Sequence, residues 1–428
     1  MEASGVTMKK FSGTALFMVL TISLILGILC SSLILMSYYY RLQYQKKERW
    51  SLLERNLNSS ITLSLHSDPK SYQEGEPFSL FREGSDSVRI QQRPWGLYTI
   101  SQCQSFIQKD SLSKVFLVGN TLDSEKSAAL YMIDENRPVG VSGNTSISGD
   151  VFVPKAGIKD AYVSDIAYTG DKAIVKGRIK NSNRSLPSLD STQLENFLSF
   201  LKNKKGPAIT LHAKDSVIQS FFSPTKVIYL GKRVVTLSGN YIQGNVILLS
   251  DTLLNLDSTV HCKDALIVAK SLVLLHGFRG SGQFFAKDSI HIGQNATLEY
   301  PSTLGVFSLD KRALPTKLVV EKNCLVEGTI FSYSSPRTTP PGFVDLGKNI
   351  HIMGHLYVRG VVRFFSGGNI RGGIFVDRVL YTSGNASYEN YLINLQLDSK
   401  TISKNYLTSP IFPFASTDKK VLKWLEKK

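Results

Sequence analysis

The tetrapeptide Ala213-Lys214-Asp215-Ser216 returns letter for letter as Ala286-Lys287-Asp288-Ser289, and each copy is followed by an apolar, β-rich run. Related two-residue turn signals recur at steps of 25, 24, 24, 35, 26 and 20 residues. They lie at Lys214-Asp215, Gly239-Asn240, Lys263-Asp264, Lys287-Asp288, Lys322-Asn323, Lys348-Asn349 and Gly368-Asn369. A period of this size is typical of a coiled stack of short strands, because each coil must turn at the same place.

A second recurrent element is a glycine set among apolar residues just before a strand-like run. It occurs at Gly149, Gly177, Gly244, Gly328, Gly354 and Gly372. A glycine inside a strand pattern marks a bend where no side chain fits. Together the two elements predict a parallel, right-handed β-helix over residues 145–402 with apolar residues inside. A β-sandwich is the competing fold, but it gives no reason for a turn at a fixed period.

One helical insertion is predicted within the coils, over residues 191–205. Thr192-Gln193-Leu194-Glu195 has the pattern of a capping box, and Gly206-Pro207 would end the helix. We expect this helix to cover the open end of the coil stack, where it would shield an unpaired strand edge. The Ser-, Thr- and Pro-rich stretch 332–342 is predicted to be a loop between coils.

The N-terminal region is predicted to be a membrane anchor. Residues 1–10 form a short basic tail, and residues 11–40 contain no charge and are long enough to span a bilayer as a helix. A cleaved signal peptide is the alternative, but no small-residue cleavage site follows the apolar run. Residues 41–66 are predicted to continue as an amphipathic helix through Trp50, Leu53, Leu57 and Ile61, ending at Ser67-Asp68-Pro69.

Both flanks of the apolar segment are basic, so the side of the membrane is not fixed by the positive-inside rule. Lys9 and Lys10 precede the segment, and Arg41, Lys46 and Lys47 follow it. Long domains can be translocated regardless of flanking charge. We therefore expect a single-pass protein of the cytoplasmic (inner) membrane whose bulk lies outside the cytoplasm.

Residues 67–144 are predicted to form a small antiparallel β meander that packs on the amphipathic helix as an α+β unit. Its expected strands are Phe78 to Phe81, Val88 to Ile90, Trp95 to Ile100, Val115 to Val118 and Ala129 to Ile133. Residues 403–428 are expected to be a basic C-terminal tail. The predicted fold class is therefore mainly β, with a transmembrane helix, a small meander domain and a β-helix.

The charge balance favours anionic neighbours. The chain has 50 Lys and Arg against 34 Asp and Glu, a formal net charge of +16. Lipid head groups, an anionic polysaccharide and nucleic acid all fit this balance. The four cysteines do not form a disulfide framework. A Cys262–Cys324 bridge is conceivable, but buried free thiols fit strand positions better.

The N-terminal plan resembles that of pseudopilins and other type IV pilin-like proteins. The resemblance rests on Lys9, Lys10, Gly13 and a long apolar helix that leaves the membrane as an amphipathic one before a β region. It implies cleavage after the glycine and a glutamate five residues beyond it, where this chain has Met18. The glycine-containing β repeats are similar to those of bactofilin-type, polymer-forming β-helix proteins, although the coils here are longer and less regular.

A search of the sequence for chemistry gives no catalytic or metal site. Asp215, Asp264 and Asp288 follow equivalent lysines and could form a column of acids across a groove, as a glycoside hydrolase would need. Turn geometry explains them equally well. Arg178-Ile179-Lys180 matches one short polygalacturonase motif without the rest of the pattern. His351 and His355 are four apart, too far for one metal on a strand, and His261-Cys262 lacks partners at ligand spacing.

The sequence therefore favours a non-enzymatic, membrane-anchored component of an envelope assembly, with protein partners and with lipid bound through residues 11–40. We expect no small-molecule cofactor. The alternatives are a carbohydrate-active β-helix enzyme on an anionic polysaccharide, and a binder of polyanions or DNA.

Overall fold

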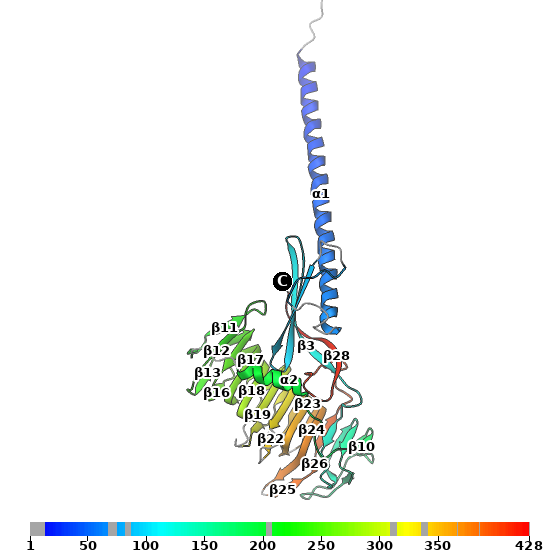
Figure 1. The fold of residues 1–428 in the computed structure, drawn as a ribbon, viewed down its shortest axis with the longest axis vertical. Helices are drawn as coiled ribbons and strands as arrows, with labels where there is room; N and C mark the ends of the chain where they lie inside the picture. The colour runs from blue at the N-terminus through cyan, green and yellow to red at the C-terminus, as the bar shows by residue number, and fades with distance from the viewer. Residues whose placement is uncertain are drawn as a thin grey trace, which may run out of the picture.

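The computed structural model describes residues 13–66, 75–81, 87–202, 208–308, 315–334, 341–365, 367–384 and 386–427. These residues are mainly β, and one long helix, α1 (Thr14–His66), projects from the β body (Figure 1). A mainly β fold with a long N-terminal helix is thus confirmed. Three predicted features lie outside the described residues. They are the basic tail at residues 1–10, the helix end at Ser67-Asp68-Pro69 and the helix end at Gly206-Pro207.

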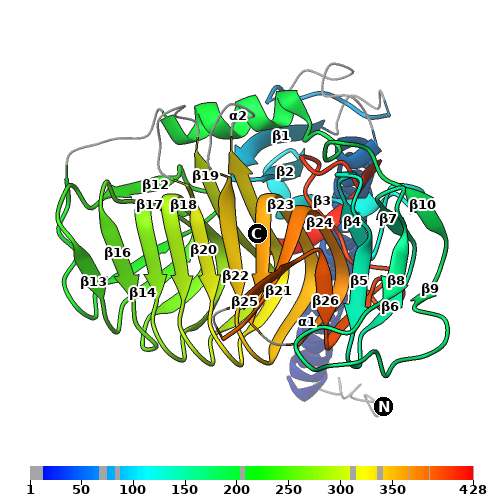
Figure 2. The ribbon, with the colours of Figure 1, turned by 90° about the horizontal axis from the view of Figure 1, so that it is seen from below.

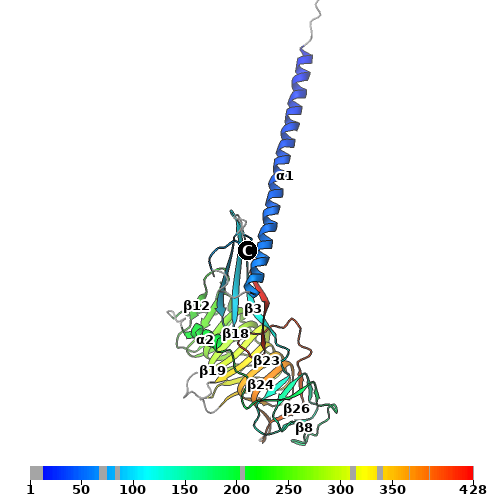
Figure 3. The same ribbon diagram turned by 45° about the vertical axis from the view of Figure 1, so that its right-hand side comes forward.

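The lower part of α1 packs on an antiparallel sheet. The sheet order is β1 (Ser87–Trp95), β2 (Tyr98–Ile107), β3 (Asp110–Leu122) and β28 (Ala415–Lys427). Leu53, Leu57 and Ile61 of α1 are buried against apolar residues of the sheet that include Ile90 and Phe116. Figure 3 shows this sheet beside the lower part of the helix. The predicted amphipathic face is the one that packs, except that Trp50 is half exposed.

The meander differs from its prediction in two strands. The expected strand from Trp95 to Ile100 contains a tight turn, because Gly96 adopts φ +62° and reverses the chain between β1 and β2. The C-terminal segment is not a tail, since β28 pairs antiparallel with β3. Its Trp424 ring packs edge-on against Phe116 at 5.3 Å. The lysines of β28 suit an edge strand, where charge discourages further pairing.

The remaining β structure is a coiled sheet of 21 strands among the described residues, referred to below as the coiled sheet. Its strands are β4 (Leu130–Met132), β6 (Ser146–Ser148), β7 (Val151–Val153), β9 (Val175–Lys176), β10 (Ile179–Asn181), β11 (Ser216–Gln219), β12 (Lys226–Tyr229), β13 (Val235–Leu237), β14 (Tyr241–Gly244), β15 (Val246–Leu249), β16 (Leu253–Leu256), β17 (His261–Leu274), β18 (Arg279–Ile292), β19 (Thr297–Ser308), β20 (Lys317–Val320), β21 (Leu325–Ser334), β22 (Gly342–Leu346), β23 (Ile350–Phe364), β24 (Gly368–Ser383), β25 (Ala386–Glu389) and β27 (Leu395–Asp398). A small parallel sheet of β5 (Val139–Ser142), β8 (Ile158–Asp160) and β26 (Tyr391–Ile393) lies beside it.

The strands of successive coils pair in parallel and place one apolar residue per coil in an inner ladder. Neighbours in this ladder from Ile228 to Ile374 are 17 to 26 residues apart, and all are buried. The ladder is Ile228, Leu248, Ile267, Phe284, Leu304, Ile330, Leu356, Ile374, Leu130 and Val151. This arrangement is compatible with a β-helix-like fold.

The coiled sheet consists of two windings that meet at a seam. The first winding comprises β4, β6, β7, β9 and β10, and the second runs from β11 to β25 and includes β27. At the seam, β24 of the second winding pairs in parallel with β4 of the first, so that Phe375 lies opposite Tyr131. β4 and β5 therefore belong to the coiled part rather than to the meander, and the domain boundary lies before residue 130 instead of at 144. The reason is that the apolar run from Ala129 to Ile133 continues both ladders of the coils.

Helix α2 (Ser191–Lys202) connects the two windings along the side of the coiled sheet (Figure 2). The predicted cap over the open end is therefore wrong. Phe197 of α2 is buried and packs on Phe285 at 4.9 Å, on Phe307 at 5.7 Å and on Phe331 at 6.5 Å. An aromatic outer face of the coils offers the helix more apolar contact than an end lined with unpaired strand backbone.

An outer ladder of mostly aromatic residues forms the second core of the molecule. It runs through Val268, Phe285, Gly305, Phe331, Tyr357, Phe375, Tyr131 and Phe152. The β1–β2 turn, α2 and the segment around Phe412 and Phe414 cover it. The meander, α2 and the C-terminal segment are therefore held on one face of the coils by apolar burial.

The recurrent turn signals do not all occupy one corner of the coil. Lys214 and Gly239, with φ of +67° and +66°, precede β11 and β14. Asp264 instead lies at an irregularity within β17, and Asp288 lies within β18, across from Lys270. The Lys-Asp pairs look alike because polar residues of this kind are favoured wherever the chain leaves the regular strand, as at the left-handed Lys214 and Asp264.

The corner that repeats most regularly is built from asparagines and glycines. Asn323 donates a hydrogen bond to Asn295 (3.2 Å), and Asn349 donates one to Asn323 (3.3 Å), with all three residues at φ between +52° and +59°. At a second corner Gly328, Gly354 and Gly372 lie in register with φ of +140° to +149°. A side chain on Gly354 would overlap the carbonyl oxygen of Gly328, so only glycine fits there.

Candidate functional site

The first half of α1 is an exposed apolar surface. No residue between 14 and 40 is buried, and Leu16 and Leu26 are 70% and 54% exposed. Leaving such side chains in water forfeits about 1.5–3 kcal/mol each. The helix is long and apolar enough to span a membrane.

Three hydroxyl groups within this apolar stretch are satisfied inside the helix. Thr21 donates to the carbonyl oxygen of Phe17 at 3.0 Å, and Ser32 donates to that of Leu29 at 2.8 Å. Ser23 bonds Leu20 in the same way at 3.0 Å. Hydroxyls paired with their own helix need no water, so they are compatible with a lipid environment.

A basic collar, defined as Arg41, Lys46, Lys47 and Arg49, separates the apolar stretch from the packed part of α1. Arg49 forms an ion pair with Asp110 at the start of β3 (3.1 Å). Nine residues of helix separate Tyr40 from Arg49, a rise of about 14 Å. The β2–β3 hairpin therefore reaches to within about that distance of the apolar stretch.

The three aspartates considered for catalysis do not meet. The carboxylate of Asp215 accepts a hydrogen bond from the backbone of His212 (2.7 Å), and Asp288 lies 3.6 Å from Lys270. Asp264 pairs with Lys423 of β28 at 2.6 Å and thereby ties the coiled sheet to the meander. These three aspartates therefore do not form a column of acids, because they lie at different corners of the coil.

The histidine and cysteine pairs also lie apart. His351 is exposed, whereas His355 is buried and stacks on Phe414 at 4.5 Å. Burial lowers the pKa of His355 to about 3. Cys262 and Cys324 are free thiols, and burial raises the pKa of Cys262 to about 12. Within the described ranges no group of three His, Cys, Asp or Glu side chains could hold a metal ion.

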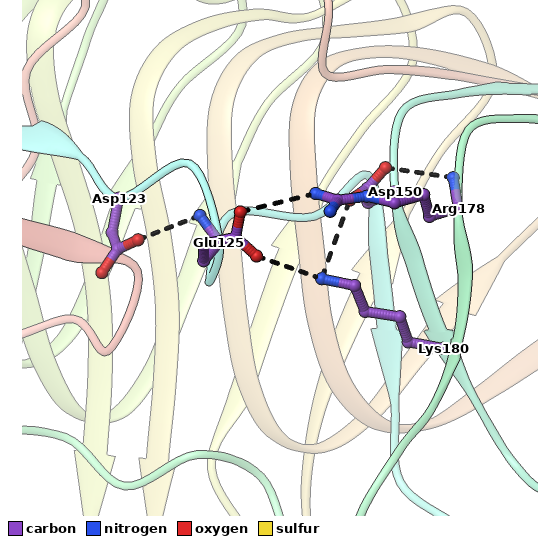
Figure 4. Close-up of polar contacts among 5 residues, drawn as sticks. All are labelled: Asp123, Glu125, Asp150, Arg178 and Lys180. Carbon is purple, nitrogen blue, oxygen red and sulfur yellow. Dashed lines mark hydrogen bonds and ion pairs between the residues drawn. The ribbon is translucent and has the colours of Figure 1, made fainter.

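Arg178 and Lys180, noted in the sequence only as part of a chance motif, belong to an ionic cluster at the first winding (Figure 4). The guanidinium of Arg178 lies 2.7 Å from Asp150, and its backbone N–H donates to the same carboxylate. Glu125 pairs with Lys180 at 3.6 Å. Burial, the largest influence, would raise the pKa of Asp150, but the bonds from Arg178 together hold it below its ordinary value. The cluster ties the segment after β3 to β10.

A cleft of about 630 Å³, called the arginine cleft below, opens where the loop before α2 passes over the seam. Arg184, Arg359 and Arg378 line it, together with Asp377 and Glu135. The loop is held in place because Tyr357 donates to the carbonyl oxygen of Pro187 (2.9 Å), and Tyr131 accepts a bond from the backbone of Asn183 (3.2 Å). The cleft wall is thus fixed by the outer aromatic ladder.

The charges of the arginine cleft do not cancel. Arg378 is neutralised by Glu135 at 2.7 Å and by Glu389 at 3.5 Å. Arg359 lies over the Tyr333 ring at 5.8 Å, beside Asp377. Burial raises the pKa of Asp377 to about 6, although Arg359 and the N–H of Gly360 oppose this shift. Arg184 is exposed and forms no ion pair within the described part of the chain.

Comparison with family models, with curated proteins and with solved structures gives no significant match. The site residues are therefore assigned from geometry alone. Sequence reasoning missed the arginine cleft because its charged residues come from segments as far apart as Glu135 and Arg378, and no local spacing marks them.

Proposed function

We propose that this protein is a non-enzymatic, membrane-anchored component of a cell-envelope assembly. The observation that carries this proposal is the continuity of α1: one helix has an exposed apolar half and a second half buried in the domain core. Such a helix transmits the position of a membrane anchor rigidly to the folded body. The coiled sheet then acts as a projecting scaffold for protein partners.

The spacing along α1 supports a body that lies close to the membrane surface. With residues 14–40 in the hydrocarbon, the basic collar reaches the head groups, where long lysine and arginine side chains can extend to the interface from either side of the membrane. Asp110 holds Arg49 at the membrane-facing end of the sheet. We assign the anchor to the cytoplasmic (inner) membrane and the body to its outer side, because long domains are translocated irrespective of flanking charge.

The likeness to pseudopilins gains support from the packing of Leu53 and Leu57 of α1 on an antiparallel sheet. Such a likeness implies that neighbouring subunits could contact the apolar half of α1. Met18 replaces the glutamate that the family pattern expects, so the subunit would occupy a special place in such an assembly.

We also assign the coiled sheet to the right-handed parallel β-helix class. The parallel register of consecutive coils supports this assignment, since crossover connections between parallel strands are right-handed in nearly all proteins. The enzyme alternative loses support, because Asp264 is engaged by Lys423 and lies at a different corner from Asp288.

Photocrosslinking in intact cells tests this proposal. A photoreactive residue at Leu26, in the apolar half of α1, is expected to capture integral membrane proteins or lipid. The same residue at Val234, 63% exposed at the far end of the coils, serves as the matched control and should capture envelope partners outside the bilayer. Protease treatment of spheroplasts should digest the body and spare residues 14–40. Extraction of the chain by carbonate without detergent would contradict the proposal.

A further inference from the structure

The arginine cleft has the size and the residues of a ligand site. Its volume of about 630 Å³ is that of a pocket for a small molecule or a short stretch of polymer. Its walls come from the loop before α2, the end of β21, the middle of β23, β24 near the seam and the segment after β4. The tyrosines that hold the loop make the cleft preformed, so a ligand would not need to order it.

The lining of the cleft combines three kinds of groups. Ser185, Ser188 and Ser191 present exposed hydroxyls, and Tyr333 presents part of a ring. Arg184 and Arg359 present guanidinium groups, which bind carboxylates through paired hydrogen bonds. Hydroxyls, a ring face and cations together match a ligand that carries hydroxyls, an apolar face and a negative group.

A nucleic acid fits this lining less well. Phosphate chains are bound by continuous basic surfaces, whereas Glu135 and Asp377 both border the cleft. Glu135 and Glu389 also engage Arg378, which leaves Arg184 and Arg359 to face a ligand against one carboxylate, that of Asp377. Two arginines and one aspartate that face the ligand suit a molecule whose negative groups are isolated and separated by neutral hydroxyls.

We propose that the arginine cleft binds an acidic saccharide, with Arg359 and Arg184 facing the sugar carboxylate and the serines facing its hydroxyls. This binding does not depend on how the chain is anchored, so its failure would leave the membrane role untouched. It gives the projecting body a partner class in the envelope that no other described surface specifies.

Asp377 makes this binding dependent on pH. The groups that face Asp377 are Arg359, Tyr357 and the N–H of Gly360 from β23, Arg378 beside it, and Glu135 after β4. At pH 7 the Asp377 carboxylate offsets part of the positive charge of Arg359 through space. As the pH falls through the raised pKa of Asp377, about 6, the carboxylate takes up a proton and no longer offsets that charge. Affinity for the acidic saccharide should therefore rise between pH 7 and pH 5, while the sugar carboxylate stays ionised.

The test is calorimetric titration of the full chain in detergent micelles with oligogalacturonates and with their methyl esters. The free acids are expected to bind and the esters to bind at least about tenfold more weakly, because esterification removes the charge-assisted hydrogen bonds. Arg359→Gln and Arg184→Gln should each weaken binding by about tenfold. Arg371→Gln, an exposed residue of β24 outside the cleft, is the control and should bind within about twofold of the parent.

Several results would overturn this assignment. They are equal binding of acid and ester, unchanged binding by Arg184→Gln, and inorganic phosphate competing as strongly as the oligosaccharide. Arg184 is exposed, so its variant is expected to fold even if Arg359→Gln does not. Asp377→Asn is expected to remove the rise in affinity between pH 7 and pH 5. A rise that persists in this variant would show that another group titrates.

Discussion

Truncation of Phe375 tests the seam between the two windings. Phe375 is 1% exposed, and its ring lies 4.7 Å from Phe414 and stacks on Tyr131 at 5.7 Å with an interplanar angle of 10°. Tyr131 belongs to the first winding, whereas Phe375 belongs to the second. Phe375→Ala therefore removes a contact that holds together two segments far apart in the sequence.

The size of the effect follows from burial. A buried Phe→Ala change costs about 3–5 kcal/mol, including the cavity that it leaves. A loss of this size speeds amide exchange through local opening by about two to four orders of magnitude. Because each coil contacts only its neighbours, we expect the increase in β4, β7, β24 and β27, and little change in β14 to β16 at the far end.

Hydrogen exchange followed by mass spectrometry on the full chain in micelles measures this difference directly. Phe365→Ala is the matched control, since Phe365 is 39% exposed and does not belong to the outer aromatic ladder. An equal loss of protection in all coils would refute the two-winding arrangement. So would unchanged exchange in β4.

Three further changes probe the anchor, the corners and the buried histidine. Leu57→Ala, at a residue 1% exposed, should lower the free energy of unfolding of the meander by about 2–5 kcal/mol in urea titrations, whereas Leu33→Ala in the exposed half of α1 should leave it unchanged. Gly354→Ala should lower the free energy of unfolding by more than about 3 kcal/mol, because the new Cβ would overlap backbone of the preceding coil. Gly157→Ala, which has open space and φ +78°, should lower it by only about 1–2 kcal/mol through backbone strain. Similar losses in the two variants would refute the stacked-corner geometry. In the folded protein His355 stays neutral down to about pH 3, whereas in the unfolded chain it takes up a proton below about pH 6.5. The free energy of unfolding should therefore decrease by about 2 kcal/mol as the pH is lowered from 7 to 5. His355→Phe should lose this pH dependence, and an unchanged dependence would show that His355 is not buried in the fold.

The coils can be predicted from the sequence because the residues that mark each corner are close together in the chain. Gly328, Gly354 and Gly372 are needed wherever a corner passes close to the preceding coil, and this requirement is visible letter by letter. The identity of each corner is not visible in this way. Asp264 and Asp288 share the letters of a turn, yet they lie at different corners, because strand register is set by the inner apolar ladder rather than by the turn residues.

The seam and the arginine cleft depend on pairings that no local pattern encodes. Phe375 meets Tyr131 across 244 residues of chain, and either strand alone could be the edge of a sheet. Strand β28 cannot be recognised in the sequence for a related reason. Its lysines resemble those of a solvated tail, and only the pairing of Val421 and Trp424 with residues of β3 makes the segment a strand. Arg184 and Arg359 meet in one cleft only because the loop before α2 is held over the seam by Tyr357.

Cysteine accessibility along α1 is the most direct measurement of the membrane role. Cys30 is replaced by alanine, and the three remaining cysteines are buried and so shielded. Single changes Leu20→Cys, Leu26→Cys, Leu33→Cys and Tyr44→Cys are then treated with an aqueous maleimide in intact membranes. We expect Tyr44→Cys to react and the other three to stay unmodified until detergent is added. Reaction of Leu26→Cys at the rate of Tyr44→Cys in intact membranes would contradict a helix that crosses the bilayer.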